Sequence, residues 1–327
     1  MSTVDAIAAP GTVDRVRGAA SWRALGTYVD LRTHPDVVDA AAARAAEVLD
    51  EVDLACSRFR DDSDLALANR SAGTPVAVSP VLVGAVRVAL EAATETDGIV
   101  DPTLGDLLSA AGYDRTFALV PADDPSAAEL PVRRGSWRDV VVTEGTVTVP
   151  PRAALDLGAT GKAFAADLVA LTLEDAFDVP VLVGVGGDVR VARAGRTASD
   201  DPVGYPVVVG HSLADLAAGG PRTRVTLSSG GLATSSVSAR RWRRGGRQWH
   251  HLVDPRTGTP AAGRWRTVTA LGHTAAAANT ATTAAIVLGD AALEWLTARG
   301  VAARLVDHEG RVSRTPHWVA LGVEEQP

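Results

Sequence analysis

Small residues, a lone lysine and the start of a predicted helix come together in the run 156–162, Asp-Leu-Gly-Ala-Thr-Gly-Lys. Little side chain blocks a ligand from approaching such a backbone. The N–H groups at a helix start favour anions, phosphates above all, and Lys162 adds a positive charge at the same place. The spacing matches neither the P-loop nor the Gly-x-Gly-x-x-Gly motif. The run predicts a site for a diphosphate or a metal-bound phosphate; the alternative is an ordinary turn with a solvated lysine.

Further segments combine Gly, Ser, Thr or Asp with a tight turn, as the wall of a large ligand pocket requires. These segments are 57–69, 98–105, 184–188, and the two runs 234–236 and 250–258, which we take together. Each one alone is typical of a loop. Only their combination can therefore identify a function.

Composition narrows the class of protein. The chain has 327 residues, of which 46% are hydrophobic, enough for a substantial core. Its net charge of -7 argues against a nucleic-acid partner. The single cysteine, Cys56, excludes an internal disulfide and a cysteine-based zinc site. Five arginines gather within 240–247, where we expect a solvated loop in preference to an anion-binding role.

The first 20 residues have no basic start followed by an apolar run, so they do not resemble a signal peptide. We expect a mobile tail over 1–20. No stretch is long and apolar enough to insert into a membrane. The sequence therefore favours a soluble cytoplasmic protein, although removal of a leader that directs export would leave the same sequence.

Hydrophobic periodicity predicts helices and strands in roughly equal measure. We expect helices over 35–54, 79–96, 103–111, 163–177, 274–288 and 291–299. We expect strands over 22–31, 181–185, 189–192, 205–209, 222–227, 249–253 and 267–272, with hairpins over 137–149 and 305–312. Strands outnumber regular β-α-β alternations. The pattern predicts an α+β fold, one large domain over 21–327 with mixed or antiparallel sheets and packed helices.

Taken in order, the segments resemble the ApbE family, the FAD:protein FMN transferases. The family's S-x-Y, S-x-L and Asn are similar to 57–69, with Phe59 at the aromatic position. Its D-P-T-x-G resembles 101–105, its D-L-G-G-x-A-K-G-Y-A-x-D resembles 156–167, and its G-G-D resembles 186–188. Its T-S-G resembles 234–236, its H-H-I-x-D-P-x-T-G resembles 250–258, and its final A-D-A-x-x-T helix resembles 278–283. The resemblance covers about 22–314.

The resemblance implies a transfer of FMN from FAD to a threonine hydroxyl of an acceptor protein, with AMP leaving. It also implies Mg²⁺, a hard cation that takes oxygen ligands and suits a diphosphate. In the family the metal is held by a main-chain carbonyl of the D-L-G-G turn and by the final helix. The corresponding residues here are Ala159 (through its carbonyl), Asn279, Thr282 and Thr283.

The same resemblance assigns roles around FAD. His251 is the expected proton acceptor, because histidine titrates nearest neutrality; the alternative is a structural or FAD-contacting histidine. The expected FAD-binding residues are Leu25, Phe59, Ile99, Val100, Asp101, Asp156, Lys162 and Leu252. Of these, Lys162 would face phosphate and Phe59 would pack against a flavin or adenine ring. Core packing is the alternative for Leu25, Phe59 and Leu252, and turn capping for the two aspartates.

One departure from the family pattern bears on the metal. Asn279 stands where the family has aspartate, and a neutral amide oxygen is a weaker ligand for Mg²⁺ than a carboxylate. Either metal affinity falls, or another acid such as Asp156 or Asp188 compensates. With Ser236, Ala159 and Ala163 in place of glycines, the chain is expected to be a divergent member. Two other functions stay open: an FAD pyrophosphatase, in which water replaces threonine, and a non-catalytic FAD-binding protein.

Overall fold

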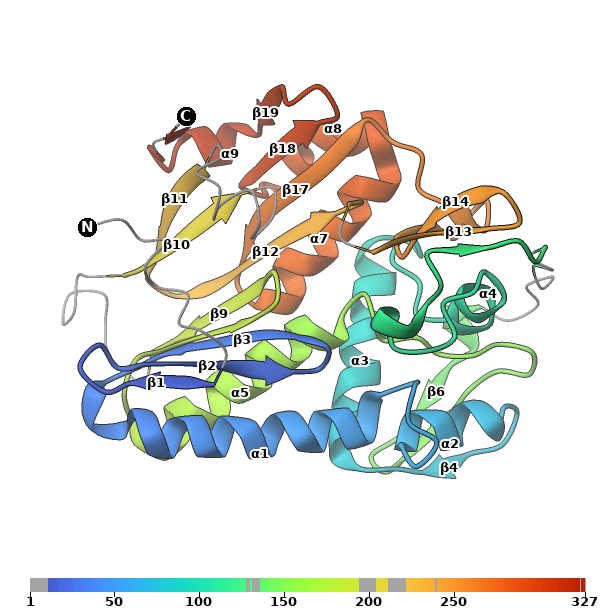
Figure 1. Cartoon of the computed structure of the whole chain (residues 1–327), viewed down its shortest axis with the longest axis horizontal. Coiled ribbons are helices and arrows are strands. Elements are labelled where there is room, and N and C mark those ends of the chain that lie inside the picture. The colour runs from blue at the N-terminus through green and yellow to red at the C-terminus, as the bar shows by residue number, and fades with distance from the viewer. Residues whose placement is uncertain are drawn as a thin grey trace.

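A nine-stranded antiparallel sheet organises the computed structural model, which describes residues 11–127, 130, 136–193, 204–210, 222–238, 240–323 and 325–326. The strand order is β1-β2-β3-β8-β9-β12-β17-β18-β19 (Figure 1). The strands are β1 (Thr12–Asp14), β2 (Ala19–Ala24), β3 (Thr27–Arg32), β8 (Val181–Val185), β9 (Asp188–Ala192), β12 (Gly230–Ser236), β17 (Trp265–Gly272), β18 (Ala303–Asp307) and β19 (Val312–Arg314).

Helices cover one face of this sheet. They are α1 (Val38–Cys56), α5 (Gly161–Phe177) and α7 (Ala275–Leu288). Helix α5 packs on β8 and β9, and α7 packs on β12 and β17, while α1 lies beside α5 along the lower edge in Figure 1. Alanine-rich surfaces let α5 and α7 approach the sheet closely, and α7 is buried almost all round, as a helix inside a core must be.

Side chains alternate between the two faces of the sheet along each strand, so each face contributes to a hydrophobic cluster. Val181 and Val183 of β8 join the cluster beneath α1 and α5, and Leu182 between them points to the opposite face. There it packs with a smaller sheet made of β10 (Tyr205–Gly210), β11 (Arg222–Leu227) and β20 (Glu325–Gln326), and with α9 (Pro316–Val319).

The remaining elements lie beside the helical layer. They are α2 (Asp64–Arg70), α3 (Pro80–Glu95), α4 (Gly105–Ala110), α8 (Ala292–Ala298), and the short 3₁₀ turns η2 (Pro35–Val37), η3 (Phe117–Leu119), η4 (Trp137–Asp139) and η5 (Gly289–Ala291). Their strands are β4 (Val76–Ala77), β6 (Val141–Val142) and β7 (Thr146–Thr148) in one sheet, β5 (Asp123–Asp124), β13 (Arg241–Arg244) and β14 (Arg247–His250) in another, and β15 (Val253–Asp254) with β16 (Thr259–Pro260).

The predicted α+β class is confirmed, but several elements differ from expectation. The span 22–31 is a hairpin, because Leu25 and Gly26 both adopt positive φ (50° and 68°) and turn the chain between β2 and β3. The span 249–253 breaks after His250, and the arginine-rich 241–244 is a strand of a hairpin, not a loop. The first half of the expected hairpin 137–149 begins as η4.

The N-terminal segment expected as a tail is only partly described. Residues 1–10 lie outside the described residues, Thr12–Asp14 form β1, and β2 begins at Ala19. Among the helices that the structure describes, none combines the length and apolar character needed to cross a membrane.

Candidate functional site

Hydrogen bonds join three of the sequence segments at the turn before α5. The Asp156 N–H donates to the Pro102 carbonyl at 2.8 Å, which ties this turn to the 101–105 segment. Asn69, at the end of α2, brackets the preceding residue: its Oδ1 accepts from Leu155 N–H at 2.7 Å and its Nδ2 donates to the Leu155 carbonyl at 3.0 Å. The turn is thus fixed from two sides before any ligand binds.

Asp156 is neutralised by Arg58, a residue that the sequence did not single out. The two side chains form an ion pair and are only 9% (Arg58) and 10% (Asp156) exposed. The Asp156 carboxylate also accepts from Gly158 N–H at 2.7 Å, so it caps its own turn as well. Asp156 is therefore already partnered and is a poor candidate to compensate for the missing metal carboxylate.

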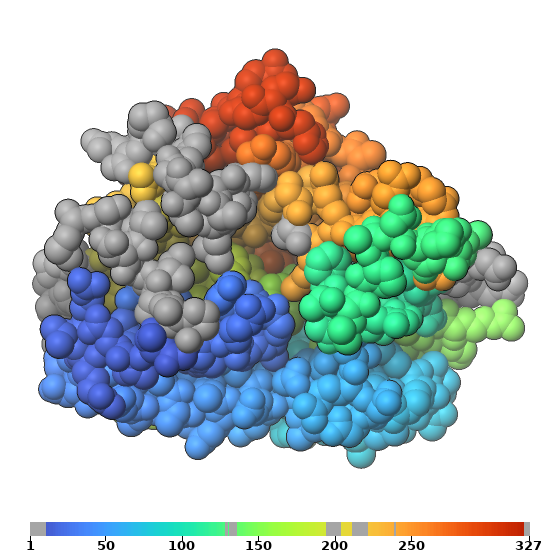
Figure 2. Space-filling view, in the orientation of Figure 1, coloured from blue at the N-terminus to red at the C-terminus, as the bar shows by residue number. Residues whose placement is uncertain are grey.

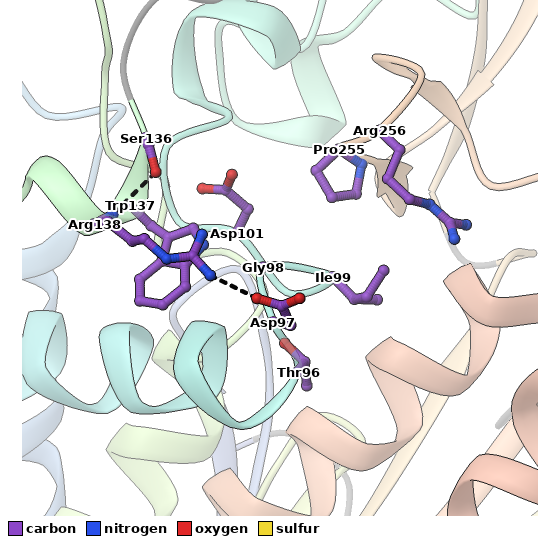
Figure 3. Close-up of a pocket in the computed structure, with 10 residues that line it drawn as sticks. All are labelled: Thr96, Asp97, Gly98, Ile99, Asp101, Ser136, Trp137, Arg138, Pro255 and Arg256. Atoms are coloured by element: carbon purple, nitrogen blue, oxygen red, sulfur yellow. Dashed lines mark hydrogen bonds and ion pairs between the residues drawn. The ribbon is translucent and has the colours of Figure 1, made fainter.

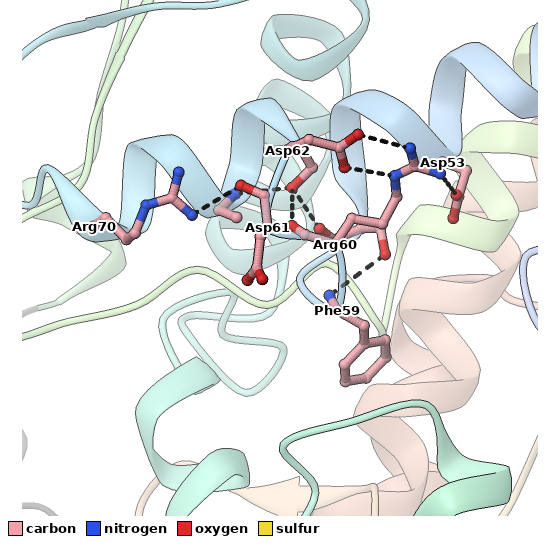
Figure 4. A network of polar contacts seen from close by, with 9 residues as sticks. Asp53, Phe59, Arg60, Asp61, Asp62 and Arg70 are labelled. Atoms are coloured by element: carbon pink, nitrogen blue, oxygen red, sulfur yellow. Dashed lines mark hydrogen bonds and ion pairs between the residues drawn. The ribbon is translucent and has the colours of Figure 1, made fainter.

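Arg58 also fixes the aromatic ring of the same segment. Its guanidinium carbon lies 4.3 Å from the Phe59 ring centroid and 4.7 Å from that of Tyr113, and its Nη2 donates to the Tyr113 carbonyl at 2.5 Å. Phe59 remains 37% exposed, and Figure 4 shows its ring turned away from the Arg60–Asp62 polar network. A half-exposed, held ring of this kind can stack on a planar ligand.

Lys162 stands in the first turn of α5 and lies against the β8–β9 turn. Its side chain reaches Gly186, where a Cβ would meet Lys162 Cε at 3.6 Å. Burial lowers the pKa of Lys162, and the nearby charge of Asp188 opposes that effect. The backbone N–H groups of Lys162 and Ala163 make no hydrogen bond within the described part of the chain. One ammonium group and two helix N–H groups are thus available to an anion.

Asp188, the first residue of β9, is buried and held by Asn279 of α7. Asn279 Nδ2 donates to Asp188 Oδ1 at 2.9 Å, and Asp188 is only 2% exposed. Burial raises the pKa of Asp188, while the Lys162 charge and the Asn279 amide oppose it. With its amide nitrogen on the carboxylate, Asn279 directs Oδ1 toward Thr283, whose hydroxyl donates to it at 3.4 Å.

Hydroxyl groups continue this polar cluster along α7. Ser235, on β12, lies 2.9 Å from Thr282 Oγ1 and 3.4 Å from Thr283 Oγ1, measured from its own hydroxyl oxygen. Thr282 also donates to the Asn279 carbonyl at 3.0 Å. No hydrogen bond reaches the carbonyl oxygen of Ala159 within the described residues. The structure thus brings Asn279, Thr282 and Thr283 together, and adds Ser235, which the sequence presented only as part of a loop.

A carboxylate on α5 fixes the position of α7. Asp167 accepts hydrogen bonds from the Ala275 and Ala276 N–H groups, both at 2.9 Å, at the first turn of α7. An acidic side chain at a helix start satisfies otherwise unpaired N–H groups and complements the helix dipole. The helix that carries Lys162 therefore also anchors the helix that carries Asn279.

The two adjacent histidines differ in their partners. His250 Nε2 contacts the Ala261 carbonyl at 3.1 Å, a structural hydrogen bond. The His251 ring is hydrogen-bonded to the backbone of Arg240. Nδ1 of both histidines is buried without a hydrogen-bond partner within the described residues. Burial, followed by the charges of Arg240 and Lys162, lowers the pKa of His251 well below its ordinary value of 6.5. His251 is therefore neutral at physiological pH, and the same burial makes it a weaker base than an exposed histidine.

A cavity of about 500 Å³ lies between the 96–101 segment and the turn after β15, and neither Lys162, Asn279 nor His251 lines it. In Figure 3, Trp137 and Arg138 stand on one side, Pro255 and Arg256 on the other, and Asp101 between them. Ile99 lines the same cavity. Asp101 Oδ1 accepts from Thr103 N–H and Oγ1 at 2.8 and 2.6 Å, so this aspartate also caps its own turn. Figure 2 shows the surface hollowed where the blue, green and orange parts of the chain meet.

Three of the expected FAD-binding residues present little side chain. Val100 and Leu252 are 3% and 6% exposed and belong to hydrophobic clusters, so a ligand could reach only their backbone. Leu25 is partly buried in the β2–β3 turn. That turn lies against the β8–β9 turn, since Gly186 N–H donates to the Tyr28 carbonyl at 2.8 Å.

Similar proteins are found by sequence and by structure. The chain is 31% identical over 274 residues to the FAD:protein FMN transferase of Treponema pallidum, covering 77% of this chain and 72% of that protein. It is 27% identical over 332 residues to the FAD:protein FMN transferase of Klebsiella pneumoniae, covering 98% and 92%. The ApbE protein of Thermotoga maritima superposes with a TM-score of 0.74 at 23% identity, covering 93% of this chain and 98% of that one. The apo flavinyl transferase ApbE of Pseudomonas stutzeri superposes with a TM-score of 0.73 at 21% identity, covering 93% and 96%.

The two structural likenesses establish the fold, an α+β architecture with a large antiparallel sheet. The family model described as the ApbE family matches residues 25–305, which include every segment of the site described above. This chain belongs to the ApbE family.

Proposed function

We propose that this protein transfers FMN from FAD to a threonine hydroxyl of an acceptor protein, releasing AMP, in a reaction that uses Mg²⁺. Membership of the ApbE family and relatives named FAD:protein FMN transferase support the transfer. The observation that carries the proposal furthest is the buried oxygen cluster of Asn279, Thr282 and Thr283, next to Asp188 and within range of the Lys162 charge. Such a cluster suits a diphosphate and its counter-cation.

The donor atoms fit a hard cation. Mg²⁺ takes oxygen ligands, commonly one or two from the protein with the remainder from water and phosphate. Asn279 Oδ1, the hydroxyls of Thr282 and Thr283 and the Ala159 carbonyl would hold it. No group of three or more His, Cys, Asp or Glu side chains in the described residues offers an alternative centre. When bound, Mg²⁺ would neutralise charge on the diphosphate oxygens.

Side chains of this protein account for the remaining steps. Lys162 and the free N–H groups of α5 would bind the diphosphate and orient it. The threonine oxygen of the acceptor attacks the phosphorus of the FMN half, and the bond from that phosphorus to the bridging oxygen breaks. AMP leaves with the electron pair, and neutral His251 takes the threonine proton. Phe59, held by Arg58, would stack on a ring of FAD.

A labelling experiment tests the transfer. The protein, FAD, Mg²⁺ and a candidate acceptor are incubated together, and a denaturing gel is read for covalent flavin fluorescence. A fluorescent acceptor band supports the proposal. No band with an acceptor that a relative labels under the same conditions contradicts it. FMN and AMP formed without any acceptor, at a comparable rate, would indicate the pyrophosphatase reaction instead.

A second function, FAD binding without chemistry, is favoured by one observation. The Asn279 side chain is neutral, and its amide nitrogen is already bound to Asp188, so position 279 itself offers no charged ligand to a dication. Tight FAD binding with no turnover at any Mg²⁺ concentration would support this function. Transfer that rises with Mg²⁺ would exclude it.

A further inference from the structure

Most arginines around the site are paired with acids. Arg58 pairs with Asp156, Arg244 with Asp124 at 3.2 Å, and Arg256 with Asp254 at 2.8 Å. Arg240 differs: it is half-buried, and its side chain forms no ion pair or hydrogen bond with any residue that the structure describes. A partly buried guanidinium without an anionic partner is unusual, because desolvating a charge is costly unless it is compensated.

The backbone places Arg240 beside His251. Strands β13 and β14 pair with Arg241 opposite His250, so continuing the same register sets Arg240 opposite His251. Five residues upstream, Ser235 contacts Thr282 and Thr283. The charge of Arg240 also acts on three groups of the site, since it lowers the pKa of Lys162, Asp188 and His251.

The charges of the described residues at this place do not balance. Lys162 and Arg240 bring two cations, and of the two described acids that act on Lys162, Asp188 and Asp156, the second is already neutralised by Arg58. Asn279 adds no charge, and His251 is neutral. An excess of positive charge in a half-buried site attracts an anion.

We propose that Arg240 is a second phosphate-binding cation of this protein, which with Lys162 holds the diphosphate of FAD even when no metal is bound. The inference rests on the proposed function for the identity of the ligand. Arginine suits the task because its planar guanidinium forms paired, charge-assisted hydrogen bonds to phosphate oxygens. Arg240 and Lys162 would thereby supply part of the positive charge that a bound metal ion would otherwise bring, since the neutral Asn279 is a weak metal ligand.

Ligand titrations in excess chelator test this role. The full-length protein and its Arg240→Met, Arg240→Lys and Arg243→Met variants are titrated with FAD, ADP and riboflavin by calorimetry. Arg243 is the matched control: it lies three residues along on β13, is exposed, and loses the same charge. Riboflavin has no phosphate, so its affinity reports on the flavin contacts alone. Thermal unfolding of each variant verifies the fold.

We expect Arg240→Met to lower the affinities for FAD and ADP about 10- to 100-fold and to leave the affinity for riboflavin unchanged. The affinities of Arg243→Met should stay within about twofold of those of the wild type. Arg240→Lys should recover part of the ADP affinity. Equal ADP affinity for wild type and Arg240→Met, or a loss that extends equally to riboflavin, overturns the proposal. Wild-type protein that binds ADP through Arg240 but does not bind FAD overturns the proposed function and leaves the anion site standing. Failure of the wild type to bind ADP without metal overturns the anion site itself.

Discussion

The amide nitrogen of Asn279 donates a 2.9 Å hydrogen bond to Asp188, and both residues are buried beneath the β8–β9 turn. The pair joins α7 to the strand beside Lys162 and fixes which atom of the amide faces the neighbouring hydroxyls. A carboxyl group at position 279 would change this arrangement from an attractive contact to two acids in one buried place.

Asn279→Asp should raise the affinity for Mg²⁺ and make the metal-free protein less stable. The substitution removes the hydrogen bond to Asp188 and sets two carboxyl groups side by side, at a cost of about 1–3 kcal/mol. A bound dication would offset that repulsion. Melting temperatures measured across a Mg²⁺ titration should therefore start lower and rise further in the variant. Equal titration midpoints for the two proteins would contradict the prediction.

Arg58→Met should destabilise the protein by about 3 kcal/mol, because it leaves Asp156 uncompensated in a nearly buried place. Arg58→Met combined with Asp156→Asn should recover part of that loss. Urea unfolding of the two single variants and the double variant measures the coupling between the side chains. Additive losses, with no recovery in the double variant, would mean that packing of Arg58 against Phe59 and Tyr113 outweighs the ion pair.

His251→Ala should abolish transfer of FMN while FAD still binds. A general base contributes about 10²- to 10⁴-fold to rate, and its loss leaves the phosphate contacts intact. The neighbouring His250→Gln provides the control, since His250 is occupied by the Ala261 carbonyl. Rates of acceptor labelling and FAD titrations, measured on both variants, separate binding from chemistry. Wild-type transfer by His251→Ala would remove this histidine from the mechanism.

Lowering the pH should reduce the free energy of unfolding of the wild type more than that of the His251→Gln variant. The folded protein holds the pKa of His251 well below 6.5, so the unfolded chain binds a proton that the folded site excludes. Above pH 6.5 this difference in proton binding leaves the free energy of unfolding unchanged. As the pH falls below that value, proton uptake by the unfolded chain lowers the free energy of unfolding. Between pH 7 and pH 5 the wild type should lose about 1–2 kcal/mol more than His251→Gln, measured by denaturant unfolding at each pH. Parallel pH curves for the two proteins would refute the assignment.

Helices and strands with a clear local sequence signal were predicted correctly, whereas a strand without such a signal was missed. Ser79 followed by Pro80 predicted the start of a helix, and α3 begins at Pro80 with the Ser79 hydroxyl accepting from Leu82 N–H. β12 was missed because its sequence, Gly-Gly-Leu-Ala-Thr-Ser-Ser, lacks the alternation of a half-exposed strand. It runs between β9 and β17, so that small residues on both faces suffice.

Motif order predicted which segments approach one another, but it did not predict the pairings of their side chains. Motif order located the turn before α5, the final helix and the histidines. Nothing in the sequence indicated that Arg58 forms an ion pair with Asp156. Their contact depends on how α2 and the 101–105 segment pack against the turn before α5. Arg240 was equally hidden, because a run of arginines resembles a solvated loop until strand pairing sets one of them opposite His251.

The carboxylate of Asp167 joins the two helices that carry Lys162 and Asn279. Helix α5 begins at the Lys162 turn, and further along the same helix Asp167 holds the first turn of α7, which carries Asn279 one turn later. Loss of that carboxylate would therefore release the start of α7, and with it Asn279, from the helix that carries Lys162.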